Sequence, residues 1–92
     1  IESFPEDFAV NLILGLSLAQ LEKHSDALPY LEKSVNLNSN DITALSAYAF
    51  TLNQLKDYDQ AVFYLEKALH EIYLFEQLIP HRSMPLFWAQ GS

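Results

Sequence analysis

The sequence contains no cysteine and only two glycines, and these absences remove several classes of site. Without cysteine there are no disulfides, no thiolate zinc sites and no cysteine nucleophile. Gly15 lies inside an apolar segment and Gly91 is next to the last residue, so no glycine-rich loop can hold a phosphate group. No nucleophile-elbow motif accompanies the serine, histidine and aspartate residues. We therefore expect neither an enzyme nor a cofactor site.

Basic residues are also scarce, with five Lys and Arg against twelve Asp and Glu and a net charge of −7. Nucleic-acid recognition needs a basic footprint, so this charge argues against it, whereas a basic protein segment would be a compatible partner. Long apolar runs are missing too. The longest stretch, Leu12–Ala19, is shorter than the roughly 18 residues of a membrane span, and we expect none. The chain begins at Ile1 without Met, and we expect it to be part of a longer protein.

What the sequence does contain is an internal repeat. Tyr-Leu-Glu-Lys occurs at Tyr30–Lys33 and again at Tyr64–Lys67, 34 residues later. The match extends without a gap when Phe8–Val35 is aligned with Ile42–Leu69. A period of about 34 residues is typical of stacked helix–turn–helix units, so the sequence predicts an all-α chain.

Local signals place the ends of the expected helices. Ser3 is expected to cap the first helix, and Ser25 or Asp26 the second. Asp41 follows a loop rich in Asn and Ser and is expected to cap a third helix over about residues 42–55. Asp59 is expected to cap the fourth. Pro29 falls early in the second helix, where it should distort the backbone little.

The repeat does not continue past the second unit. Residues 70–74 lack the turn residues found at the equivalent place in unit one, so the fourth helix should run on to about Ile79. Pro80 and Pro85 then end it. The predicted organisation is a repeat domain over residues 1–79, with units at about 8–41 and 42–75, followed by an apolar tail over residues 80–92.

Small and large residues alternate in the two units as in the tetratricopeptide repeat, which this sequence resembles. Gly15 and Ala49 occupy the small position of each first helix, and Ala27 and Ala61 that of each second helix. The resemblance implies antiparallel helical hairpins stacked as a short right-handed α-solenoid, with Gly15 and Ala49 in contact with Ala27 and Ala61. It also implies that the array ends after unit two, with the long fourth helix as a cap.

The resemblance further implies a concave groove lined by the first helix of each unit, and a non-enzymatic scaffold or adaptor function. Carried over by position, the candidate partner-binding residues are Ala9, Leu12, Ile13, Leu16, Gln20, Ser46, Phe50, Asn53 and Gln54. Repeats that hold acidic chaperone tails use Lys and Asn at such positions. That set is missing here, so a peptide or helix with apolar anchors is the expected ligand.

Three further interpretations remain open at this point. The groove could be covered by a preceding helix of the parent protein, by the tail around Trp88, or by a second copy of the chain in a homo-oligomer, since two units are fewer than the roughly three such arrays need. The module could also shield a hydrophobic segment of a partner, like a chaperone, or serve only as a structural spacer. Glu66 and His70 have the spacing of two metal ligands on one helix face, but no third ligand is indicated and we expect no metal.

Overall fold

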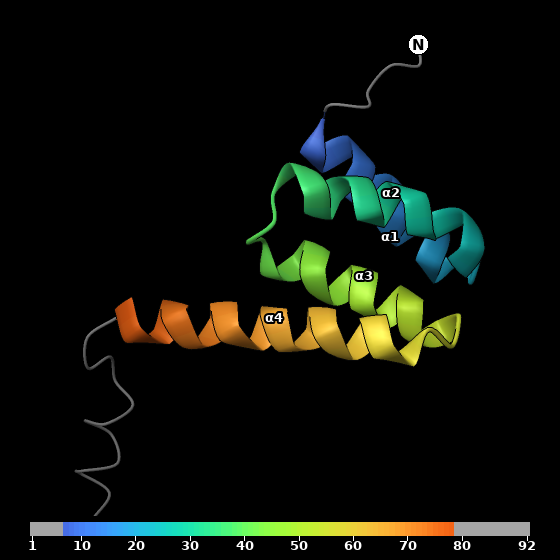
Figure 1. Cartoon of the computed structure of the whole chain (residues 1–92). Coiled ribbons are helices and arrows are strands. Elements are labelled where there is room, and N and C mark those ends of the chain that lie inside the picture. The colour runs from blue at the N-terminus through green and yellow to red at the C-terminus, as the bar shows by residue number, and fades with distance from the viewer. Residues whose placement is uncertain (1–6, 79–92) are drawn as a thin grey trace, which may run out of the picture.

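The computed structural model describes residues 7–78, which form four α-helices. They are α1 (Phe8–Gln20), α2 (His24–Leu37), α3 (Ile42–Gln54) and α4 (Tyr58–Leu78). Each helix packs mainly on its neighbours in the sequence, and α1 contacts α3 only slightly. In Figure 1, α1 and α2 form one hairpin, α3 lies beside α2, and α4 forms the opposite side of the stack. The predicted all-α class of stacked helical hairpins is confirmed.

The first helix of each hairpin begins with the same cap. The Asp7 carboxylate accepts a hydrogen bond from the Val10 amide at 3.0 Å, and the Asp41 carboxylate accepts one from Ala44 at 3.1 Å. Such a cap satisfies one of the amides that a helix start leaves without a partner. The prediction for Asp41 is confirmed. The prediction for α1 is corrected, because Asp7 caps it; Ser3 lies outside the described residues.

Both first helices also end in the same way, on a residue with left-handed backbone geometry. Glu22 has φ 63° and Lys56 has φ 70°, and these residues are 34 positions apart. The amide of the next residue then donates a hydrogen bond back to the helix. The Lys23 amide donates to the Leu18 carbonyl at 2.8 Å, and the Asp57 amide donates to the Leu52 carbonyl at 2.9 Å. This pattern is a Schellman motif, which usually contains glycine at the left-handed position.

The Schellman motifs also explain why the predicted caps of α2 and α4 are wrong. The carbonyl oxygens of Lys23 and Asp57 already accept the first helical hydrogen bonds, from Ala27 and Ala61 at 2.9 and 3.0 Å. Helices α2 and α4 therefore begin directly after the turn, before the predicted caps. Ser25 and Asp26 lie inside α2 and Asp59 inside α4. Pro29 lies within α2, which continues without a break to Leu37.

Helix α2 comes close to α1 at Gly15. A Cβ atom added there would lie 2.5 Å from Leu31 Cδ2, 2.6 Å from Leu31 Cγ and 3.2 Å from the Leu31 backbone nitrogen. The nearest atoms therefore belong to Leu31, one helical turn further along α2 than Ala27, the residue expected to contact Gly15. Gly15 is needed for this spacing because even a methyl group would overlap Leu31.

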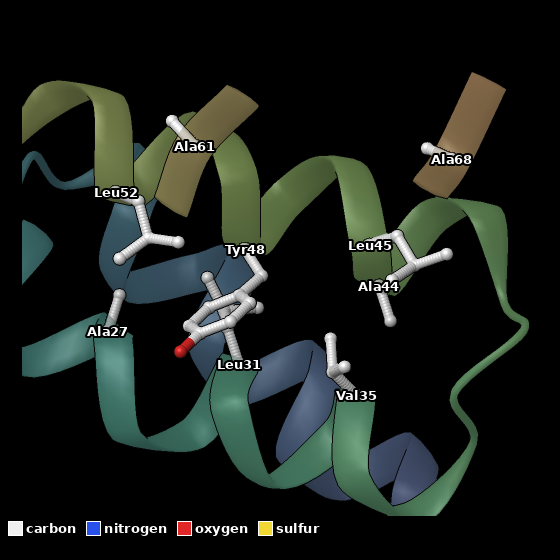
Figure 2. Close-up of a cluster of buried hydrophobic side chains, with 9 residues drawn as sticks. All are labelled: Ala27, Leu31, Val35, Ala44, Leu45, Tyr48, Leu52, Ala61 and Ala68. Atoms are coloured by element: carbon white, nitrogen blue, oxygen red, sulfur yellow. The ribbon is translucent and has the colours of Figure 1, made fainter. Parts of the chain in front are cut away.

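The core is formed by side chains of α2, α3 and α4, with α3 packed on each of the other two helices. Leu31, Leu45 and Ala44 are fully buried, and Val35 is nearly so. Figure 2 shows Tyr48 projecting from α3 toward Leu31 of α2. Its ring also meets that of Tyr64 on α4 edge to face, with centroids 4.8 Å apart. One aromatic side chain thereby links three helices, which favours a single stack over two separate hairpins.

Helix α4 continues past the point where α2 turns. Leu37 ends α2, whereas the equivalent residue Glu71 is followed by seven more helical residues up to Leu78. In Figure 1 this part of α4 extends beyond the end of α3. The prediction of a long fourth helix is thus confirmed as far as Leu78. Ile79 and the predicted tail over residues 80–92 lie outside the described residues.

Replacing Gly15 with Ala tests the close approach. Alanine favours a helix interior by about 1 kcal/mol over glycine, but overpacking against Leu31 should cost about 1–3 kcal/mol. We expect a net loss of about 1 kcal/mol and a melting temperature lower by roughly 4–8 °C in a domain of this size. Thermal denaturation followed by circular dichroism measures the change. Ser17→Ala, at an exposed position of the same helix, is the control and should not lower the melting temperature; a more stable Gly15→Ala chain would contradict the packing argument.

Tyr48 provides a pH-dependent test of the core. Burial, reinforced by the charges of Glu32, Tyr64 and Asp57, raises its pKa from 10.0 to about 12. The unfolded chain therefore loses this proton near pH 10 while the folded chain keeps it. Stability from Tyr48 is complete below pH 10 and is lost as the pH rises toward 12. An absorbance titration should contain one component near pH 12 that is absent from Tyr48→Phe. Identical titrations of the two proteins would show that Tyr48 is not buried in this way.

Candidate functional site

A groove of about 690 Å³ lies between α1 and α3, at the end where α2 begins. It is present because these two helices scarcely touch, so their inner faces stay open. Its lining combines apolar and polar side chains. The lining residues are Leu16, Ala19, Gln20, Glu22, His24, Thr43, Ser46, Ala47, Phe50 and Gln54.

Five of the nine predicted partner-binding residues line this groove, and four do not. The five are Leu16, Gln20, Ser46, Phe50 and Gln54. Of the others, Leu12 is partly buried against the core, while Ala9, Ile13 and Asn53 are exposed outside the lining. The groove runs along only the second half of α1. Helical periodicity predicts which way a side chain points, but it does not predict where along the helix the surface is concave.

Five lining residues lie outside the predicted set. Ala19, Thr43 and Ala47 belong to α1 and α3, like the predicted residues, whereas Glu22 and His24 come from the turn between α1 and α2 and from the start of α2. Glu22 occupies the left-handed position of that turn, and His24 is the first residue of α2. The His24 ring meets the Phe50 ring edge to face, with centroids 6.1 Å apart. The turn therefore brings a residue of α2 against a residue of α3 and closes one end of the groove. The internal alignment contained a signal for this packing, since the counterpart of His24 is an aromatic residue, Tyr58.

Phe50 is the most prominent apolar group of the groove. Its side chain is 52% exposed although it lies among Leu16, Ala19 and Ala47. Full burial of an exposed Phe side chain is worth about 1.5–3 kcal/mol, so covering the exposed half of this ring can contribute about 1 kcal/mol. Phe50 is therefore the natural contact for an apolar anchor.

The polar groups of the groove favour backbone recognition over charge recognition. The amides of Gln20 and Gln54 lie 34 residues apart in equivalent positions, and both side chains are exposed. The Ser46 hydroxyl donates to the Ile42 carbonyl at 2.8 Å, so its oxygen is left as an acceptor. Among the described residues of the lining, Glu22 is the only charged one and none is Lys or Arg.

Other candidate sites on the chain are less well formed. Glu66 and His70 are both exposed on α4. Among the described residues, no three His, Asp or Glu side chains come together in a way that could hold a metal ion. Within residues 7–78, no helix combines the length and the apolar character required to cross a bilayer.

Comparison with known protein families agrees with the two helical repeats. The sequence model of the tetratricopeptide repeat matches residues 9–41 and 42–69, which together make up most of the chain. The chain belongs to the tetratricopeptide repeat family. No match to a curated protein sequence is found. Tetratricopeptide repeats are generally protein–protein interaction modules and are typically not catalytic.

His24 offers a test of how the groove is closed. Its Nδ1 atom is buried and has no hydrogen-bond partner within the described structure. An unsatisfied buried polar group costs about 1–3 kcal/mol, whereas a phenyl ring can keep the contact with Phe50. We expect His24→Phe to stabilise the fold by about 1 kcal/mol in chemical denaturation.

The control for this substitution is His70→Phe, because His70 is exposed on α4. It should change the free energy of unfolding by less than about 0.5 kcal/mol. Equal effects of the two substitutions would show that hydrophobicity alone, and not the closed end of the groove, causes the gain.

Proposed function

We propose that this repeat pair is a non-enzymatic scaffold or adaptor module that binds a peptide or a helix of a partner protein in the groove between α1 and α3. The observation that carries the proposal is the half-exposed Phe50 ring within a concave, mainly apolar surface. Ligand sites of this kind combine apolar walls with a few polar groups that fix orientation. Shielding of a hydrophobic partner segment would use the same surface.

The amides around the groove support a ligand with accessible backbone groups. Gln20 and Gln54 can each donate and accept, and the oxygen of Ser46 can accept. An extended peptide offers amide and carbonyl groups along its whole length. Such a peptide can place one apolar side chain on Phe50 and bond to these groups on either side.

Charge then selects among possible peptides. Glu22 supplies negative charge at the rim, no basic residue lies in the lining, and the chain as a whole carries −7. Like charges repel and opposite charges steer association. The preferred ligand is therefore neutral or basic, with an aromatic or aliphatic anchor.

Peptide selection tests this function. A phage-displayed library of random peptides is selected on the purified chain, and the recovered sequences are synthesised and titrated by fluorescence anisotropy. The recovered peptides should carry apolar anchors and little negative charge. Phe50→Ala should weaken their binding at least about tenfold, which corresponds to about 1.4 kcal/mol.

Phe63→Ala is the matched control for Phe50→Ala. Phe63 is 59% exposed on α4 and lies outside the groove, so the same side chain is removed from a surface of similar exposure. Binding to this variant should equal binding to the unmodified chain. Peptides that bind Phe50→Ala as well as the unmodified chain would place the interaction surface elsewhere.

A further inference from the structure

The repeat allows α4 to be compared with α2 position by position, and one face differs. Leu31 of α2 is fully buried, whereas its counterpart on α4, Leu65, is 45% exposed. Val35 is 5% exposed and its counterpart Leu69 is 63% exposed. Val62, the counterpart of a partly buried leucine of α2, is exposed as well. Val62, Leu65 and Leu69 follow one another at spacings of three and four and form one stripe, here called the α4 stripe.

The neighbouring helix is the cause of this difference. Positions that face the partner within each hairpin are buried in both units, as for Ala27 and Ala61 and for Ser34 and Ala68. Helix α2 has α3 packed on its other face, whereas no described helix occupies that place on α4. The α4 stripe therefore corresponds to the face of α2 that α3 covers.

Helix α1 shows the complementary difference from α3. Thr51 of α3 is fully buried, but its counterpart Ser17 is exposed. Tyr48 is 5% exposed, whereas Leu14 is 40% exposed. Val10, Leu14 and Ser17 form one line along α1, here called the α1 stripe. It is the face that α3 uses against α2, and α1 has no helix on it within residues 7–78.

We propose that copies of this chain associate head to tail, with the α1 stripe of one copy packed on the α4 stripe of the next. The contact would reproduce between two chains the α2–α3 interface that already exists within one. It joins two different surfaces of the protein, so the association is heterologous and open-ended. The groove between α1 and α3 is not part of it, and this inference does not depend on the proposed function.

The chemistry of the two helices suits this contact. Neither α1 nor α3 contains a charged residue, so the net charge of −7 does not fall on the docking helix. Terminal helices of repeat arrays usually present a polar outer face, whereas the α4 stripe is apolar and so leaves a surface that another helix can cover. Within the chain, a loop after α2 connects it to the helix that covers it. Helix α4 continues through the equivalent position without turning, but a covering helix from a separate chain needs no such loop.

Two single substitutions, each at an exposed position, separate the two stripes. Ser17→Glu places a charge on the α1 stripe, and Leu69→Glu places one on the α4 stripe. Sedimentation velocity over a range of concentrations should show the unmodified full chain increasing in average mass with concentration. Each variant should remain monomeric, with an unchanged circular dichroism spectrum and melting temperature at low concentration.

Mixing the two variants provides the decisive measurement. The Ser17→Glu chain keeps an intact α4 stripe and the Leu69→Glu chain keeps an intact α1 stripe, so together they can form one interface. We expect the equimolar mixture to contain a species of twice the monomer mass and nothing larger. The controls are Ala9→Glu and Phe63→Glu, whose positions lie off the stripes and are exposed in both units. They should associate like the unmodified chain.

Three results would overturn the proposal. An unmodified chain that stays monomeric at all concentrations would mean that another segment covers the α4 stripe. Loss of association in Leu69→Glu alone, with no dimer in the mixture, would indicate a symmetric contact between two α4 helices. Equal loss in the controls would show that the added charge acts without regard to position.

Discussion

The contact of Gly15 with Leu31 sets the geometry on which the remainder of the stack depends. With no Cβ atom at Gly15, α1 comes close to Leu31, which is fully buried with α3 packed on the other face of α2. That spacing fixes the surface that α2 presents to α3, and Tyr48 extends the packing from α3 to α4. In unit two the same position holds Ala49, also fully buried. The two hairpins therefore share one architecture while differing by a methyl group at this position.

The same packing creates the groove, because it leaves α1 and α3 with little contact between them. Helix α2 lies against both α1 and α3, which places these two helices on one side of it with little contact between them. Their inner faces cannot bury each other, so apolar side chains such as Phe50 remain uncovered. His24 closes one end because the turn after α1 is tight. A binding surface thus follows from helix order and turn geometry without any residue specialised for chemistry.

Much of this could be predicted from the sequence because the repeat fixes a register. The fold, the Asp41 cap and the length of α4 follow from periodicity and from residues with strong local preferences. The turns could not be predicted in the same way. Glu22 and Lys56 adopt left-handed geometry that a sequence normally signals with glycine, and tertiary packing selects it here. For this reason the predicted starts of α2 and α4 differ from the observed ones, and two groove residues that the turn positions, Glu22 and His24, were not predicted.

The groove residues and the α4 stripe show two different limits of a repeat alignment. Leu12 and Leu16 both lie on the inner side of α1, yet only Leu16 lines the hollow, because the depth of the groove depends on the neighbouring helix. Leu31 and Leu65 are identical residues in identical registers, and one is buried while the other is half exposed. Sequence specifies what a position can bury, and the adjacent helix determines whether it does. When an apolar position is covered by a helix in one unit and exposed in the next, the covering helix of the first unit shows what kind of helix can pack on the exposed position.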